Sequence, residues 1–220
     1  MASGNRQSRL IKYSPAEELA NRISHAVAFI ASLVGLVLLV AVATRSGGPW
    51  RIASCTIFAS SMLFFYAAST LYHSVRSDRA RYLFRILDHA GIYLLIAGTY
   101  TPITLVTLSG KVGWWLFGSV WSLAIGGIVF KSMMVHRLKF LAPFLYIVLG
   151  WLIIFAFEPL LEAMPLPGVN LLITGGVIYT VGILFYAIDK IPFNHAIWHL
   201  FVIGGSFFHY LAIYQYVARG

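Results

Sequence analysis

The sequence is poor in acidic residues and has almost no cysteine. Only seven of its 220 residues are acidic, 10% are charged, and 60% are apolar. Too few polar side chains are present to cover a soluble globule. The single cysteine, Cys55, has no partner in the chain, which excludes an intrachain disulfide. The polar first twenty residues have no short apolar core before a small-residue cleavage site, so we expect no cleaved signal peptide.

Long apolar runs separated by short charged clusters make up most of the chain. A helix needs about 20 apolar residues to cross the hydrocarbon layer, and seven runs of that length follow one another. The predicted fold is an all-α integral membrane protein, a seven-transmembrane helix bundle at 22–220 that follows a cytosolic N-terminal segment at 1–21. The predicted spans are about 22–44, 52–75, 84–107, 112–131, 138–158, 168–187 and 195–218.

Lysine and arginine are distributed unevenly between the two sides of this predicted bundle. The richer side has Arg6, Arg9, Lys12, Arg22, Arg76, Arg79, Arg81, Arg85, Lys131, Arg137, Lys139 and Lys190. The poorer side has Arg45, Arg51, Lys111 and Arg219. Cytoplasmic loops carry the excess of positive charge, so we expect the N-terminus in the cytosol and the C-terminus outside. Because the basic residues flank apolar runs, their expected partner is the anionic lipid surface and not nucleic acid.

Several polar residues fall in one layer near the cytosolic end of the predicted spans. His73 comes two residues before the second span ends, Asp88 lies about one turn inside the third, and His195 opens the seventh. His199 follows His195 by four residues, so both imidazoles project from one helix face. Ser69 and His73 share the same spacing.

This layer has the composition of a metal site. Zinc sites with chemistry to perform typically use three protein ligands and leave a fourth position open, and His73, His195 and His199 fit that number. Asp88 could hold or deprotonate an attacking water, and Ser69 could donate a hydrogen bond to a substrate carbonyl. A lone histidine in a membrane helix is more often a packing residue, but the shared depth favours metal binding.

A further polar stripe lies at the start of the first predicted helix. Glu18, Asn21 and His25 follow one another at intervals of three and four residues, and so share one face. Two interpretations stay open: a hydrogen-bonding network around the metal ligands, or a direct role in the site. His89 points about 100° away from Asp88 on the same helix, and for it we predict a structural role.

These residues resemble the motifs of the bacterial haemolysin III family, within the larger group of progestin and adiponectin receptors. The matching segments are EELANRISH at 17–25, STLYHS at 69–74, LDHAGI at 87–92 and NHAIWH at 194–199. The resemblance implies a seven-helix bundle of the bacterial inner membrane, a plasma membrane, with its N-terminus inside. It also implies zinc held by His73, His195 and His199, with Asp88 beside the attacking water and Ser69 nearby.

Three functions are compatible with these observations. The leading prediction is a zinc-dependent intramembrane hydrolase of a lipid amide or ester, with membrane lipids as substrate and Asp88 as general base, because eukaryotic relatives are similar to ceramidases. The second is a non-enzymatic sensor or regulator in which structural zinc joins the second and seventh spans, which a fourth protein ligand would favour. The third is a pore-forming cytolytic protein, suggested by the family name, although the helices are too hydrophobic for a soluble toxin.

Overall fold

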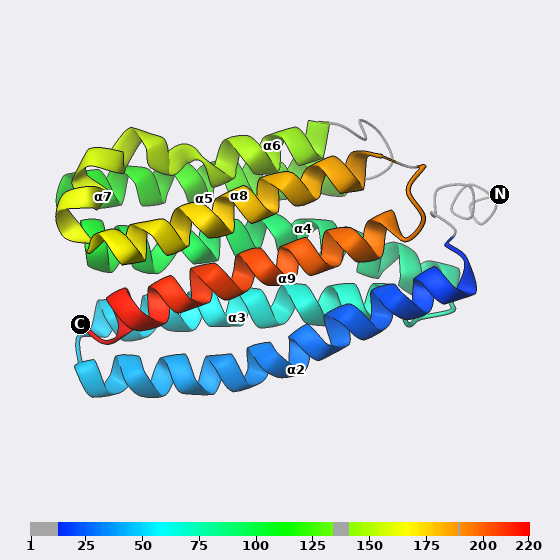
Figure 1. Cartoon of the computed structure of the whole chain (residues 1–220), viewed down its shortest axis with the longest axis horizontal. Helices are drawn as coiled ribbons and strands as arrows, with labels where there is room; N and C mark the ends of the chain where they lie inside the picture. Colours follow the sequence, from blue (N-terminus) through cyan, green and yellow to red (C-terminus); the bar gives the residue numbers. More distant parts are fainter. Residues whose placement is uncertain (1–12, 134–140, 189) are drawn as a thin grey trace.

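The structure is a computed structural model that describes residues 13–133, 141–188 and 190–220 (Figure 1). Seven of its helical stretches are long and apolar enough to cross a membrane, which confirms the predicted fold class and number of spans. The elements are α2 (Pro15–Ser46), α3 (Pro49–Tyr72), α4 (Asp78–Pro102) with the π-helix η1 (Ile103–Leu108), α5 (Gly110–Met133), α6 (Leu141–Gly150), the 3-10 helix η2 (Leu152–Ala156), α7 (Phe157–Ala163), α8 (Leu166–Ala187), and α9 (Asn194–Ile213) with the π-helix η3 (Tyr214–Ala218).

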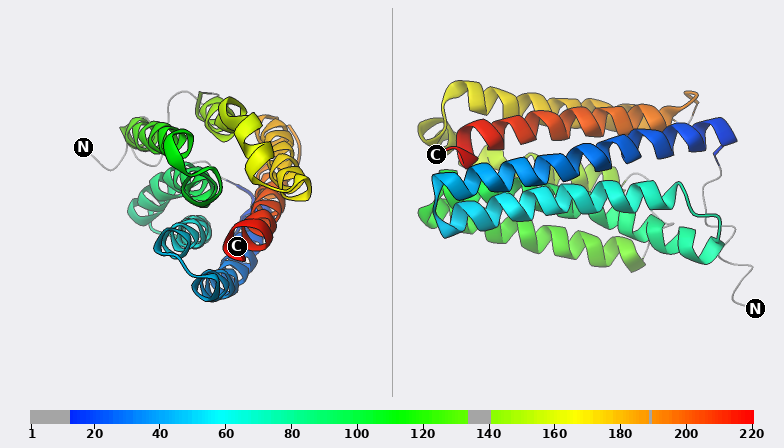
Figure 2. Two further views of the ribbon diagram at one scale, coloured as in Figure 1. Left: turned by 90° about the vertical axis from the view of Figure 1, so that its left-hand side faces the viewer. Right: turned by 90° about the horizontal axis from the view of Figure 1, so that it is seen from below.

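The spans form a ring in the order of the chain. Each packs against the next, and α9 closes the ring against α2, as the end-on view in Figure 2 shows. Large apolar side chains remain on the outside, for example Val27, Ile30 and Val37 of α2, which are 62%, 63% and 63% exposed. Apolar side chains can contact lipid tails without a free-energy cost, whereas their contact with water is unfavourable. The chain is therefore a multi-pass membrane protein.

The first helix begins seven residues before the predicted start of its span. Ser14 and Glu17 form a capping box, in which the Glu17 amide donates to Ser14 Oγ (3.3 Å) and the Ser14 amide donates to Glu17 Oε2 (3.0 Å). Pro15 occupies the first turn, where its missing amide hydrogen costs nothing. The early start places Glu18 and Asn21 on the same regular helix as His25.

The second and third spans also differ from the predicted boundaries. α3 ends at Tyr72, so His73 caps its C-terminus and does not lie two residues inside it. α4 begins at Asp78 and not at 84, because Ser77 provides an extended N-cap residue and the acidic Asp78 suits a first helical turn. Arg81, which we expected in a loop, therefore lies on a helix.

The fifth span is interrupted, although its sequence predicts one continuous helix over 138–158. The phenol of Tyr100 on α4 donates to the carbonyl of Gly150 (2.7 Å) and accepts from the amide of Ile153 (2.9 Å). A side chain inserted into a helical hydrogen-bond ladder breaks it, and here α6 gives way to η2 at Trp151.

The two ends of the described chain lie at opposite ends of the bundle (Figure 1). We propose that the end at which α2 begins faces the cytosol, because the basic residues gather there. Five of the residues that support this proposal lie outside the described part of the chain, namely Arg6, Arg9, Lys12, Arg137 and Lys139.

Thiol labelling tests this orientation. Single cysteines would replace Ser77 or Pro167 in a Cys55→Ala background. Both residues are exposed, and they lie at the starts of α4 and α8, at opposite ends of the bundle. In intact cells an impermeant reagent should label position 167 and leave position 77 unlabelled until the cells are lysed. Equal labelling in intact cells would refute the orientation. The wild-type chain is the control and should not be labelled, because its one cysteine, Cys55, is fully buried.

Candidate metal centre

Three histidines converge at the end of the bundle where α2 begins. One ring nitrogen from each of His73, His195 and His199 lies within 4.8 Å of the others. His73 follows α3, whereas the other two occupy the first two turns of α9. His73 and His199 are 3% and 2% exposed, and His195 is half-buried. The sequence-based prediction that these three side chains meet is confirmed.

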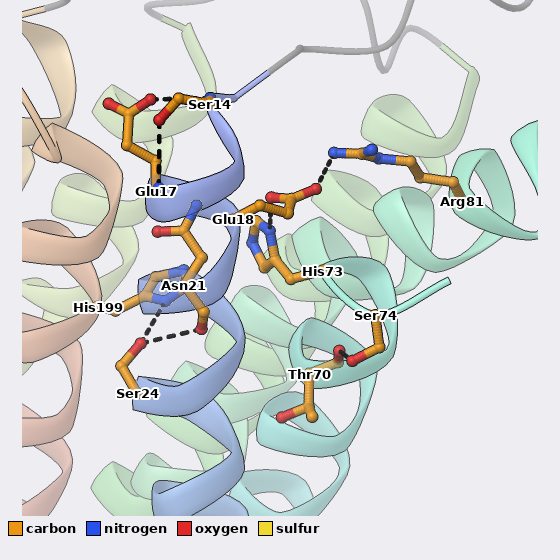
Figure 3. A network of polar contacts seen from close by, with 10 residues as sticks. All are labelled: Ser14, Glu17, Glu18, Asn21, Ser24, Thr70, His73, Ser74, Arg81 and His199. Atoms are coloured by element: carbon orange, nitrogen blue, oxygen red, sulfur yellow. Dashed lines mark hydrogen bonds and ion pairs between the residues drawn. The ribbon is translucent and has the colours of Figure 1, made fainter. Parts of the chain in front are cut away.

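Hydrogen bonds to Nδ1 orient two of the three rings (Figure 3). His73 Nδ1 donates to Glu18 Oε2 at 2.8 Å. His199 Nδ1 lies 3.0 Å from Ser24 Oγ, whose hydrogen goes to the carbonyl of Asn21, so the imidazole is the donor. A proton on Nδ1 leaves the lone pair of the neutral ring on Nε2. Both histidines thus present Nε2 as the atom that can bind a metal.

The remaining contacts of Glu18 tie three parts of the bundle together. Its Oε1 accepts from the guanidinium of Arg81 on α4, while Oε2 holds His73 (Figure 3). Carboxylates that hold a ligand histidine in this way fix the ring and raise its basicity.

The third ring, His195, lies against an aromatic side chain from the start of the chain. The ring of Tyr13 stacks on it at 5.1 Å between centroids and 25° between planes. Burial raises the pKa of Tyr13 well above its ordinary value, so the phenol stays neutral beside the imidazole.

Unpartnered nitrogens show that this cluster fits a metal ion. His73 Nε2 and both nitrogens of His195 are buried without a hydrogen bond among the described residues. A buried polar atom with no partner costs free energy, and coordination of a cation by these lone pairs would remove that cost. Three imidazoles are a donor set that suits zinc and other late first-row metals.

His25 and Asn21 lie beside the cluster without joining it. The rings of His25 and His199 stack at 3.5 Å between centroids, with only 12° between their planes. Two rings stacked face to face cannot both direct an in-plane lone pair at one ion, so this geometry favours His25 as a neighbour of the ligands and not a fourth ligand. The side-chain atoms of Asn21 are buried and have no hydrogen-bond partner in the described structure.

Asp88 is a buried acid near the histidines and is the candidate general base. It is 6% exposed, and His73 and Ser69 are both within its electrostatic range. Ser69 Oγ is itself buried and lies close enough to the Asp88 carboxyl to interact with it. Helical phase directs the side chains of His89 and Asp88 about 100° apart, yet His89 Nδ1 lies 3.5 Å from Asp88 Oδ2. The same nitrogen donates to the carbonyl of Arg85 (2.8 Å).

Comparison with known proteins gives the family of the chain. Residues 13–210 match the family model described as haemolysin-III related. The chain belongs to the haemolysin III family.

Relatives in this family cover nearly the whole chain. Hemolysin-3 of Bacillus cereus is 46% identical over 201 residues, which are 91% of this chain and 92% of that protein. The Hemolysin-3 homolog of Bacillus subtilis (strain 168) is 46% identical over 92% of this chain and 95% of its own length. The human monocyte to macrophage differentiation factor is 29% identical over 94% of this chain and 88% of its own, which extends the relationship to the progestin and adiponectin receptor group. Such bacterial proteins reside in the inner membrane.

Sequence reasoning did not find three residues that shape this haemolysin III site. Ser24 lies within a segment that carries the family resemblance, yet nothing in the sequence indicates its bond to His199. Arg81 was assigned to a loop by its charge. Tyr13 precedes every apolar run and gives no signal of its own. A helix start at Ser14 would have placed Ser24 one turn beyond Asn21 and so beside the polar stripe.

Removal of a ligand histidine should remove the metal. Purified His73→Ala, His195→Ala and His199→Ala proteins should each contain little metal by elemental analysis and should melt earlier, because bound metal stabilises the folded state.

The matched control for these variants is His209→Ala. His209 lies on the same helix as His195 and His199, roughly 15 Å from His199 along the helix axis. Its Nε2 donates to the carbonyl of Leu172. This variant should keep its metal. Full metal content in any one of the three ligand variants would exclude that histidine from the site.

Replacement of Glu18 should weaken the site without abolishing it. Glu18→Gln should lower metal affinity about 10–100-fold, because the amide is a weaker acceptor for His73 Nδ1 and no longer neutralises Arg81. Competition with a chelator of known affinity measures the change. Glu17→Gln is the control, because this neighbouring acid bonds Ser14 and the amide of Phe193 and does not contact a ligand histidine. Equal affinity in both variants would contradict the orienting role of Glu18.

Proposed function

We propose that the protein is a zinc-dependent intramembrane hydrolase that cleaves an amide or ester bond in a membrane lipid. The observation that carries the proposal is the meeting of three histidine nitrogens, and three alone among the described His, Cys, Asp and Glu residues, next to a buried aspartate. Three protein ligands leave a coordination position open, which is typical of catalytic zinc and not of structural zinc.

The side chains around the cluster supply the rest of the chemistry. Zinc, when bound, would act as a Lewis acid that polarises a carbonyl and makes water a better nucleophile. Asp88 would take a proton from the attacking water and return it to the leaving amine or alcohol. Ser69 Oγ, which is buried beside Asp88, would donate a hydrogen bond to the substrate carbonyl.

Apolar cavities inside the bundle support a lipid substrate. Two adjoining cavities, of about 80 and 370 Å³, share Tyr100, Trp151 and His209 in their walls. The smaller one reaches Trp198, which directly precedes the ligand His199. Their walls are almost entirely apolar, so a hydrocarbon chain fits them better than a polar substrate does.

A sensor with structural zinc is the second candidate, and one observation favours it. The ligands come from the end of α3 and from α9, and both helices pack on α2. A metal ion there would fasten these helices together whether or not it performed chemistry.

Lipid turnover by purified protein distinguishes the two candidates. The protein would be incubated with lipid extracts, with and without a metal chelator, and released fatty acids or head groups would be measured by mass spectrometry. The hydrolase proposal requires a product that chelation abolishes and that zinc restores. A folded, zinc-loaded protein that yields no such product across broad lipid classes would favour the sensor.

Asp88→Asn separates metal binding from catalysis. The variant should retain its zinc and its melting temperature, because Asp88 is not a ligand in this geometry. It should lose about 10²–10⁴-fold in hydrolysis rate, because an amide cannot accept the proton of the attacking water. Zinc content and initial rates are measured on the same preparation. Loss of zinc along with Asp88 would make the aspartate a ligand and contradict the proposed role.

A further inference from the structure

Two polar side chains lie in the walls of the otherwise apolar cavities, Tyr179 of α8 and His209 of α9. Tyr179 lines the smaller cavity, and His209 lines both. The centroids of their rings are 5.4 Å apart, and the ring planes are tilted by 60°. Each side chain has its own hydrogen-bond partner elsewhere, and no hydrogen bond in the described structure joins the two.

The hydrogen bonding of His209 leaves one nitrogen as a free acceptor. Its Nε2 lies 3.0 Å from the carbonyl of Leu172, which can only accept, so the proton is on Nε2. A charged ring would be costly at this depth in the membrane, so the imidazole is neutral and Nδ1 carries a lone pair. Nδ1 is buried and has no partner among the described residues. A hydrogen-bond donor on a bound molecule would remove the cost of this unpaired acceptor.

The hydroxyl group of Tyr179 keeps a free donor. Tyr66 donates to Ser206 Oγ (2.8 Å), and Tyr179 Oη lies 2.7 Å from the same oxygen. Ser206 is buried and bonds only these two phenols within the described ranges of the chain, so its own hydrogen goes to Tyr179. The opposite direction would leave the buried hydrogen of Ser206 without an acceptor. Tyr179 therefore accepts from Ser206 and retains its O–H for a molecule in the cavity.

The other hydroxyl groups in the cavity walls are already in use. The wall residues that carry them are Thr99, Tyr100, Tyr146 and Thr180. Each donates its hydroxyl hydrogen to a backbone carbonyl, at distances of 2.7 to 3.3 Å. Among the hydroxyl groups of these walls, only that of Tyr179 has a hydrogen left to donate.

Glycines hold the two rings in place between α8 and α9. A Cβ on Gly175 of α8 would come within 2.4 Å of His209 Cδ2, and a Cβ on Gly205 of α9 would come within 2.8 Å of the ring of Tyr179. Each ring thus packs against a glycine of the opposite helix. The donor and the acceptor are therefore positioned by the packing of the two helices and not by flexible side chains alone.

We infer that Tyr179 and His209 bind a hydroxyl group carried on the hydrocarbon chain of a lipid. A hydroxyl group can accept from Tyr179 and donate to His209 Nδ1 at once, whereas a ketone oxygen could only accept and a plain hydrocarbon could do neither. The pair lies about 15 Å along α9 from His199, so the group it binds is on the chain and not beside the bond to be cleaved. The inference rests on the proposed function, since it names a feature of the lipid substrate.

Binding of two matched fatty acids tests the inference. Ricinoleic acid and oleic acid differ only in a hydroxyl group near the middle of the chain, and their affinities for the purified protein in detergent would be measured by native mass spectrometry. The wild type should bind ricinoleic acid about 3–10-fold more tightly, the effect of one or two hydrogen bonds. Tyr179→Phe removes the donor and should reduce this preference to less than about twofold. His209→Gln should do the same, because its amide can donate to Leu172 but places no acceptor at the position of Nδ1.

Tyr66→Phe is the matched control. It removes the other phenol that bonds Ser206, but Tyr66 lines neither cavity, so the preference for ricinoleic acid should persist. Binding is measured without turnover, and Tyr179→Phe should keep its metal, so a failure here is distinct from a failure of the proposed hydrolase. Equal affinity of the wild type for the two acids would overturn the inference and leave the pair to an ordered water molecule. An unchanged preference in Tyr179→Phe and His209→Gln would also overturn it.

Discussion

The carboxylate of Glu18 is the contact around which the histidine end of the bundle is organised. One oxygen holds His73 and the other holds Arg81, so a single side chain of α2 fixes the residue that ends α3 and the first turns of α4. His73 follows the last helical residue, where the backbone gives less restraint than a helix interior. The pairing with Glu18 supplies this restraint and also sets the tautomer that leaves Nε2 free. The geometry depends in turn on the capping box at Ser14, which starts α2 early enough to make Glu18 helical.

The number and order of the spans follow from the sequence because lipid imposes a simple rule. Backbone groups in hydrocarbon must bond within their own segment, so each long apolar run becomes a helix. The interruption at Trp151 could not be predicted in this way. It depends on the phenol of Tyr100, some 50 residues earlier, which reaches two backbone groups of the fifth span. The polar helix starts at Pro15 and Asp78 were missed for a related reason, since capping and not hydrophobicity decides them.

The parts of the candidate site that depend on neighbouring residues could be predicted from the sequence, whereas contacts between distant residues could not. His195 and His199 are one turn apart on one helix, so their shared direction is a property of the sequence. His73 was grouped with them only because it lies at the same depth, and an error of three residues at the end of its helix did not change that depth. Ser24 bonds a histidine 175 residues away and Arg81 a glutamate 63 residues away, and no local pattern encodes such pairs. For His89 the helical phase gave the direction of Cβ, but the side-chain rotamer brings the ring back toward Asp88.

The end of the bundle that holds the three histidines also holds a buried acid. Asp88 of α4 lies within electrostatic range of His73. The cost of burying charge is lowest near the ends of membrane helices, so polar chemistry is least expensive there. The interior beyond this end contains the apolar cavities around Tyr100 and Trp151. Under the proposed function, the bond to be cleaved would therefore lie at the histidines and the hydrocarbon chains of the lipid would extend into these cavities.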